Sequence, residues 1–133
     1  MGDGYAVFCG LDVGKEAHHA CALDPGGQRL FDGELPQDEA RLTDLLQRLQ
    51  ERGPVLVVVD QPNTIGALPV AVARSMGVAV AYLPGLAMRR IADLHPGTAK
   101  TDARDAFVIA DAARSMPHTL RRVDVGEEAL AEL

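Results

Sequence analysis

Four aspartates stand where carboxylates could take part in chemistry. Asp12 interrupts the first apolar segment of the chain, and Asp60 directly follows the most apolar one. Burying an unpaired charge is costly, so each is expected at an exposed strand end or on a cation. Asp102 and Asp105 are three residues apart, which on a helix puts both carboxylates on one face. If the two strands are neighbours and the helix packs beside them, the four acids form one cluster.

A cluster of four carboxylates is tolerable mainly when divalent cations neutralise it. Oxygen-only ligands suit Mg²⁺ or Mn²⁺. Two such ions, roughly 3.5–4 Å apart, can activate a nucleophile and stabilise the leaving oxygen in phosphodiester cleavage. The pattern therefore predicts catalytic and metal-binding roles for the same four residues. Taken singly, each acid has an alternative role, because strand-end aspartates often cap turns, Asp102 could cap a helix and Asp105 could pair with an arginine.

The elements that must position these acids predict an α/β fold. Three short strands joined by tight connections imply an antiparallel meander, and the crossover units after it imply a mixed sheet flanked by helices. The expected elements are strands over 5–13, 17–24 and 28–34, a leucine-spaced helix that starts at Pro36 and stops at Gly53, a strand over 55–59, a helix over 67–75, a strand over 78–83, a basic helix over 86–92 and a last helix over 101–115.

The composition fits one compact domain. The chain has 133 residues, of which 47% are hydrophobic, enough to bury a core. It contains neither an apolar run long enough to span a membrane nor a signal-peptide pattern, so we expect a cytoplasmic protein with no membrane partner. Residues 1–122 are assigned to the domain, and residues 123–133 to the start of a linker or helix that leads to an absent C-terminal domain.

The charge is distributed unevenly along the chain. The net charge is −6, yet residues 74–122 hold eight Lys or Arg and only four Asp or Glu residues. Phosphate contacts are therefore expected from this second half. The candidates for nucleic-acid binding are Arg89, Arg90, Lys100, Thr101, Arg104, Arg121 and Arg122. Solvated surface charge is the alternative for the arginines, and a helix start and cap for Lys100 and Thr101.

Three segments around the acids carry a resemblance to a known family. They are GLDVGK at 10–15, VVVDQP at 57–62 and AKTDARDA at 99–106. These segments resemble the N-terminal domain of DEDD-type, RuvC-like transposases of bacterial insertion sequences, a family of bridge-RNA-guided recombinases. The similarity runs from about Tyr5 to Arg122. It implies an RNase H-like fold whose four acids fall on Asp12, Asp60, Asp102 and Asp105, although the second acid of the family is commonly Glu.

The resemblance also implies what the whole protein does. It implies metal-dependent cleavage and rejoining of DNA strands, a guide RNA, and a homodimer or higher oligomer. A nucleophilic serine is expected in the absent C-terminal domain, and neither Ser75 nor Ser115 matches its motif. The isolated chain is accordingly expected to be inactive or weakly active.

Two other classes of protein compete with this interpretation. The segment LDVG at 11–14 also resembles the first phosphate-binding turn of the actin and sugar-kinase superfamily, in which the chain would be an ATP-binding half-domain. That alternative needs a second lobe, and paired aspartates on a late helix are not typical of it. A non-catalytic assembly module is the third possibility, favoured only if the acids are dispersed in space.

The remaining potential ligands do not form a convincing set. Cys9 and Cys21 have no partners at zinc-site spacing, and a hairpin would place them roughly opposite each other as reduced core thiols. The histidines are interpreted as surface or structural residues; they are His18, His19, His95 and His118.

Overall fold

A six-stranded sheet organises the chain, for which a computed structural model describes residues 4–60, 67–85 and 102–123. The strands are β1 (Val7–Asp12), β2 (Ala17–Leu23), β3 (Arg29–Pro36), β4 (Val55–Val59), β5 (Ala79–Tyr82) and β6 (Arg121–Arg122), and the helices are α1 (Glu39–Gln50), α2 (Ala67–Ser75), α4 (Asp102–Ser115) and the short 3-10 helix η2 (Pro117–Thr119). The basic helix expected over 86–92 lies outside the described residues. No helix within the described ranges is long and apolar enough to cross a membrane.

The sheet is mixed, as the sequence predicts. Its strands lie in the order β3-β2-β1-β4-β5-β6. β1, β2 and β3 form an antiparallel meander, whereas β4 runs parallel to β1 and β5 parallel to β4. β6 was not expected: Arg121 and Arg122 pair antiparallel with Tyr82 and Ala81. Two residues are too few to show a strand period, so only the pairing with β5 identifies them as a strand.

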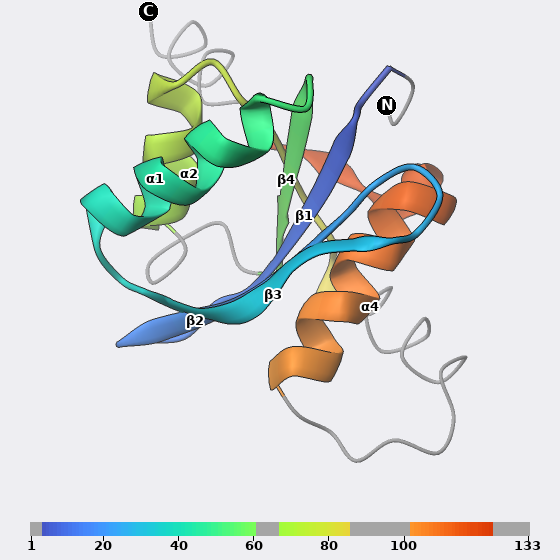
Figure 1. Cartoon of the computed structure of the whole chain (residues 1–133). Coiled ribbons are helices and arrows are strands. Elements are labelled where there is room, and N and C mark those ends of the chain that lie inside the picture. The colour runs from blue at the N-terminus through green and yellow to red at the C-terminus, as the bar shows by residue number, and fades with distance from the viewer. Residues whose placement is uncertain (1–3, 61–66, 86–101, 124–133) are drawn as a thin grey trace, which may run out of the picture.

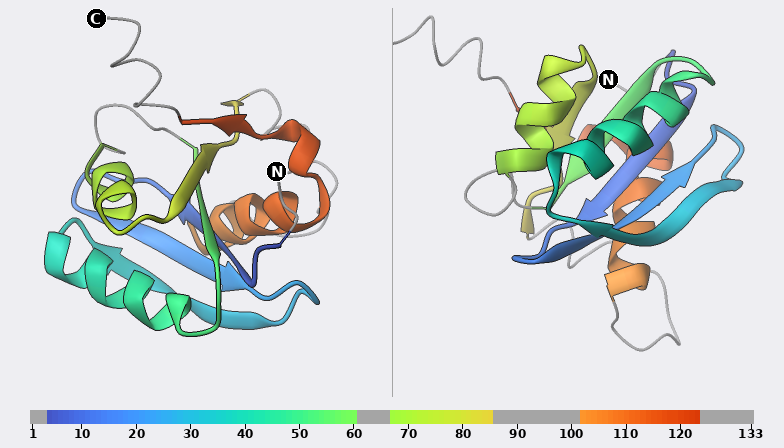
Figure 2. Two further views of the ribbon diagram at one scale, coloured as in Figure 1. Left: turned by 90° about the horizontal axis from the view of Figure 1, so that it is seen from above. Right: turned by 60° about the vertical axis from the view of Figure 1, so that its left-hand side comes forward.

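Helices cover both faces of the sheet (Figure 1). α1 and α2 lie on one face and α4 on the other, a separation that the two further views of Figure 2 also show. β1 and β4 lie between these layers, and Val55–Val59 is buried throughout. The continuous β-branched run of β4 is therefore a strand buried on both faces, as predicted.

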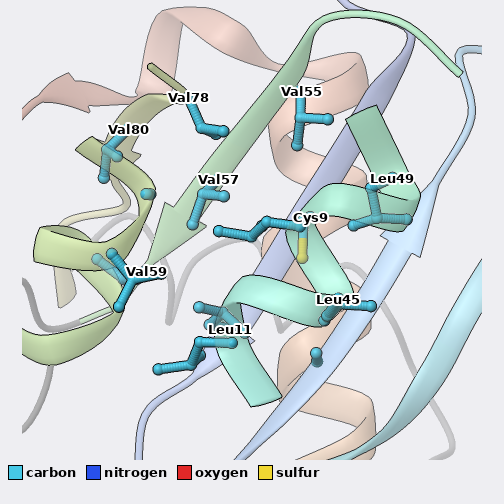
Figure 3. Close-up of a cluster of buried hydrophobic side chains, with 14 of the residues drawn as sticks. Cys9, Leu11, Leu45, Leu49, Val55, Val57, Val59, Val78 and Val80 are labelled. Carbon is cyan, nitrogen blue, oxygen red and sulfur yellow. The ribbon is translucent and has the colours of Figure 1, made fainter. Parts of the chain in front are cut away.

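Alternation along the two central strands divides the core. On the α1 and α2 face, Figure 3 shows the cluster to which the strands contribute alternate residues and α1 its leucines; labelled members are Cys9, Leu11, Leu45, Leu49, Val55, Val57 and Val59. On the α4 face, the intervening strand residues Phe8, Leu56 and Val58 pack with Val108 and Ile109. A residue's position in β1 or β4 thus decides which helix layer it meets.

The start of α1 differs from the sequence prediction. Pro36 does not begin the helix but ends β3, where it pairs with Ala17. The helix begins at Glu39, because the Asp38 side chain accepts a hydrogen bond from the Arg41 amide at 3.0 Å and caps it. The leucines of the predicted helical spacing are all buried; they are Leu42, Leu45, Leu46 and Leu49.

The two cysteines do not face each other. Cys9 pairs with Ala22, and Cys21 pairs with Gly10, so the expected register is wrong by one residue. The period-two alternation of a strand then sends the two thiols to opposite faces, Cys9 toward α1 and Cys21 toward α4. Both are free, and burial, with a smaller contribution from Cys21, raises the pKa of Cys9 to about 12. The Cys9 thiol is therefore a protonated core group.

Gly10 is the point at which α4 approaches the sheet most closely. A Cβ atom at this position would lie 2.6 Å from the Ala106 carbonyl oxygen and 2.6 Å from the Ala110 amide nitrogen. Both atoms belong to the helix backbone, which cannot move aside as a flexible side chain would. The absence of a side chain at Gly10 is thus what allows α4 to lie against β1.

We expect Gly10→Ala to destabilise the domain, since the added methyl group forces the helix off the strand. The free energy of unfolding should fall by about 1–3 kcal/mol, measured by urea denaturation. Gly26→Ala is the matched control, because there the new Cβ meets only the Asp24 side chain, at 3.4 Å. Equal stability of the two variants would contradict the close approach.

Candidate active site

Asp12 and Asp60 lie at the same edge of the sheet. β1 and β4 are parallel with Leu11 opposite Val59, and each aspartate is the next residue of its chain. The Asp60 Oδ1 atom accepts a hydrogen bond from the Val13 amide at 3.1 Å. Asp12 alternates with Phe8 and therefore belongs to the α4 face. Both aspartates are half-buried. The carboxyl ends of neighbouring parallel strands are where open α/β sheets form ligand crevices.

The first half of α4 lies toward this edge. Ala106 and Ala110 meet Gly10, whereas the later residues Ala112 and Ala113 pack in the cluster of Phe8, nearer the start of β1. The helix therefore runs back along the strand, and its first turn is at the Asp12 end (Figure 1). Asp102 is the first residue of α4, and its side chain lies outside the described part. Asp105 follows one turn later and is half-buried.

The described side chains do not by themselves make a complete metal site. Among the described residues, no group of three or more His, Cys, Asp or Glu side chains is arranged to hold a metal ion. The side chain of Asp102 is not among these residues. The donors at this edge are carboxylates, a chemistry that fits Mg²⁺ or Mn²⁺ rather than a thiolate-binding metal.

The predicted phosphate-binding residues fall into three groups. Arg121 and Arg122 are exposed on β6. Tyr82 pairs with both Val59 and Arg121, so Arg121 lies in the cross-sheet row that contains Val59, the residue before Asp60. Arg104 is half-buried on α4, beside Asp105. The remaining candidates lie outside the described residues; they are Arg89, Arg90, Lys100 and Thr101.

His18 holds the turn that follows Asp12. Its side chain is 2% exposed, its Nδ1 atom accepts a hydrogen bond from the Gly14 amide at 3.1 Å, and its Nε2 atom lies 2.5 Å from Gln37 Oε1. Because Nδ1 accepts, Nε2 carries the proton and donates to Gln37. Together with the bond from Val13 to Asp60, this contact fixes the backbone just after Asp12. The structural interpretation of this histidine is correct, but no sequence pattern indicates that Gly14 and Gln37 are its partners.

Comparison with known proteins identifies the family. A family model for DEDD transposases of the IS110 type, described as a transposase, matches residues 9–133. The chain belongs to the IS110 transposase family. It is 61% identical over 128 residues to a 43.6 kDa protein of insertion element IS110 from Streptomyces coelicolor, covering 96% of this chain and 32% of that protein.

Two further relatives of the IS110 family domain come from other insertion elements. One is a 44.8 kDa protein of IS116 from Streptomyces clavuligerus, 38% identical over 81% of this chain and 27% of the relative. The other is a 42 kDa protein of IS900 from Mycobacterium paratuberculosis, 34% identical over 96% of this chain and 32% of the relative. The chain thus spans about a third of the length of these relatives.

Solved structures show the same fold. Thermus thermophilus RuvC in complex with a Holliday junction superposes with a TM-score of 0.63 at 16% identity, covering 90% of this chain and 100% of that chain. A second structure of the same protein gives a TM-score of 0.56 at 17% identity. The RuvC-like fold is therefore confirmed, and the family match disfavours the alternative of an ATP-binding half-domain.

We expect His18→Ala to loosen the turn after Asp12, because it leaves the Gly14 amide unsatisfied and opens a cavity. The free energy of unfolding should fall by about 2–4 kcal/mol. His118→Ala is the control, since His118 is exposed and its removal should change the stability by less than about 0.5 kcal/mol. Chemical denaturation measures both values, and a stability of His18→Ala as high as that of the control would contradict the anchoring role.

Proposed function

We propose that this chain is the catalytic domain with which a transposase cleaves and rejoins DNA strands, using divalent metal ions bound by Asp12, Asp60, Asp102 and Asp105. The observation that carries this proposal is the parallel pairing of β1 with β4, which brings Asp12 and Asp60 to one edge of the sheet. The direction of α4, whose acidic first turn lies toward the same edge, supports it.

Each acid has a distinct place in the proposed site. Asp12 and Asp60 approach it from the sheet, and the Val13 amide holds one Asp60 oxygen in place. Asp102 and Asp105 approach it from the helix. Mg²⁺ or Mn²⁺, two ions in our proposal, would supply activation of the attacking oxygen and stabilisation of the leaving oxygen. Aspartate at position 60 is one methylene shorter than the more common glutamate, so we expect the site to be drawn closer to the β4 end.

The substrate and partners follow from the family and the neighbouring fold. We propose DNA as the substrate, supported by family membership and by a RuvC neighbour that is bound to a Holliday junction. Arg121, Arg122 and Arg104 would contact its phosphates, together with Arg89, Arg90, Lys100 and Thr101. Arg121 fits this role because it lies in a row with the carboxyl ends of β4 and β5.

The rest of the transposase would complete the reaction. The chain covers 32% of its relative from Streptomyces coelicolor. We propose that residues 1–122 are the acidic domain and that residues 123–133, which beyond Val123 lie outside the described part, lead toward a second domain with the nucleophile. A guide RNA and a homodimeric or larger assembly belong to the same proposal, in which this domain alone has little or no activity.

We expect Mn²⁺ to stabilise the chain, because a cation relieves repulsion among the carboxylates. At about 100 times the dissociation constant, binding should add about 2.7 kcal/mol to the free energy of unfolding. Asp12→Asn should abolish this increment. Its unfolding midpoint without metal is the baseline for this comparison.

The control for the metal experiment is Asp44→Asn, which removes an exposed carboxylate on α1 that pairs with Arg48. Its response to Mn²⁺ should equal that of the wild type. Thermal unfolding with and without millimolar Mn²⁺ measures all three proteins. An unchanged midpoint for the wild type would contradict a site preformed in this domain.

Phosphate contacts by β6 predict weaker DNA binding when Arg121 and Arg122 are both replaced by alanine. Each lost contact should reduce the slope of log affinity against log salt concentration by about 1. Titration of duplex DNA at several salt concentrations measures this slope. The control is the double variant Arg41→Ala and Arg48→Ala, which removes as much charge from α1 and should leave the slope unchanged. If replacing Arg121 and Arg122 also leaves the slope unchanged, β6 is not part of the DNA interface.

A further inference from the structure

The β2–β3 hairpin supports the first half of α4, in addition to β1. Cys21 and Leu23 of β2 are fully buried against Ala106 and Ala110 of the helix. Phe107 is partly buried against the same cluster. The part of α4 that follows Asp105 therefore rests on the hairpin, and whatever ties these two elements together also sets where the helical acids lie.

Arg29 of β3 lies where the hairpin and the helix meet. Its guanidinium carbon is 4.7 Å from the centre of the Phe107 ring, a cation–π distance. Its guanidinium group is also near the Cys21 thiol: burial raises the pKa of that thiol, and the nearby Arg29 opposes the rise. One planar group thus contacts both the helix and the strand on which the helix rests.

A chain of contacts leads from Arg29 to the strand position opposite Asp12. The Arg29 Nε atom is 3.6 Å from Asp32 Oδ2, and Asp32 Oδ1 is 2.6 Å from His19 Nε2. His19 is the direct partner of Asp12 in the pairing of β1 with β2. Its neighbour two residues on, Cys21, faces α4, so alternation places His19 on the α4 face with Asp12. Directly opposed side chains have Cβ atoms about 4.5–5.5 Å apart.

We propose that Arg29 is a positioning residue for the acidic site, an inference that rests on the function proposed above. The contacts from Phe107 through Arg29 and Asp32 to His19 begin two residues after Asp105 and end beside Asp12. They connect the helical acids to the strand acids without contributing a ligand. Half of the Arg29 side chain is exposed, so the gain in stability from its ion pair is small; its effect is to orient α4.

Metal binding should be sensitive to this orientation. Ligands must be held within roughly 0.5 Å of a productive geometry, and loss of a group that orients them typically lowers metal affinity about 10–100-fold. Arg29→Met, which keeps an unbranched apolar stem but loses the planar cation, should weaken Mn²⁺ binding by about 10-fold. Arg29→Lys, which keeps the cation, should recover part of that loss. Phe107→Leu should behave like Arg29→Met.

The experiment uses the 133-residue chain and has two readouts. The first is the ¹H–¹⁵N spectrum without metal, in which Arg29→Met and Phe107→Leu should shift the amides of residues 12–14 and 103–106. The second is the affinity for Mn²⁺, measured by calorimetry on proteins whose unfolding midpoints are also compared. The control is Arg48→Met, which removes an arginine paired with Asp44 on α1, away from α4; it should change neither readout.

The two readouts separate this inference from the proposed function. The positioning role is overturned if Arg29→Met binds Mn²⁺ as tightly as the wild type does and leaves the amide signals of residues 12–14 unshifted. If the wild type itself binds no Mn²⁺, the proposal of a preformed metal site is wrong. The metal-free spectra then decide the role of Arg29. Shifted amide signals at residues 12–14 and 103–106 support that role, and unshifted signals overturn it. If Arg29→Met does not fold, Arg29→Lys and Phe107→Leu give the same decision.

Discussion

The parallel pairing of β1 with β4 is the constraint on which the other features depend. Both strands are buried between two helix layers, and burial of each Val or Leu side chain contributes about 1.5–3 kcal/mol. These side chains fix the register, because a slip of one residue would turn every buried side chain to the opposite layer. The same register places Asp12 level with Asp60. Core packing therefore sets the level of the two acids, and the hydrogen bond from the Val13 amide then holds one Asp60 oxygen in place.

The close approach at Gly10 adds the third element. A helix that touches the strand backbone has little freedom to slide, since the Ala106 and Ala110 backbone meets the strand where Gly10 has no side chain. The small residues of α4 that face the sheet serve the same approach; they are Ala106, Ala110, Ala112 and Ala113. The contact of small residues with β1 and the Arg29–Phe107 contact with the hairpin thus both hold the same part of α4.

The net negative charge of the chain is compatible with a role on DNA because of where its acidic and basic side chains lie in the fold. In the proposed site, cations neutralise the carboxylates at the edge of the sheet. Several other acids pair within the fold: Asp44 with Arg48, Asp111 with Arg114, and Asp32 with Arg29 and His19. Arg121, in contrast, is exposed in the row next to Asp60. Net charge therefore says less about partners here than the local distribution does.

The sequence by itself determined the order of β1 to β5 with α1, α2 and α4, the mixed sheet, the buried leucines of α1 and the placement of acids at two strand ends and on the last helix. These features follow from local periodicity and from a family motif. Only the tertiary structure decided the register that separates Cys9 from Cys21, the pairing of β6, the anchoring of the turn by His18 and the contact between Arg29 and Phe107. The β6 pairing and the Arg29–Phe107 contact join residues distant in the chain, the cysteines are separated by a shift of one residue, and the His18 bond spans only four residues but belongs to a turn. None of these contacts leaves a period in the sequence.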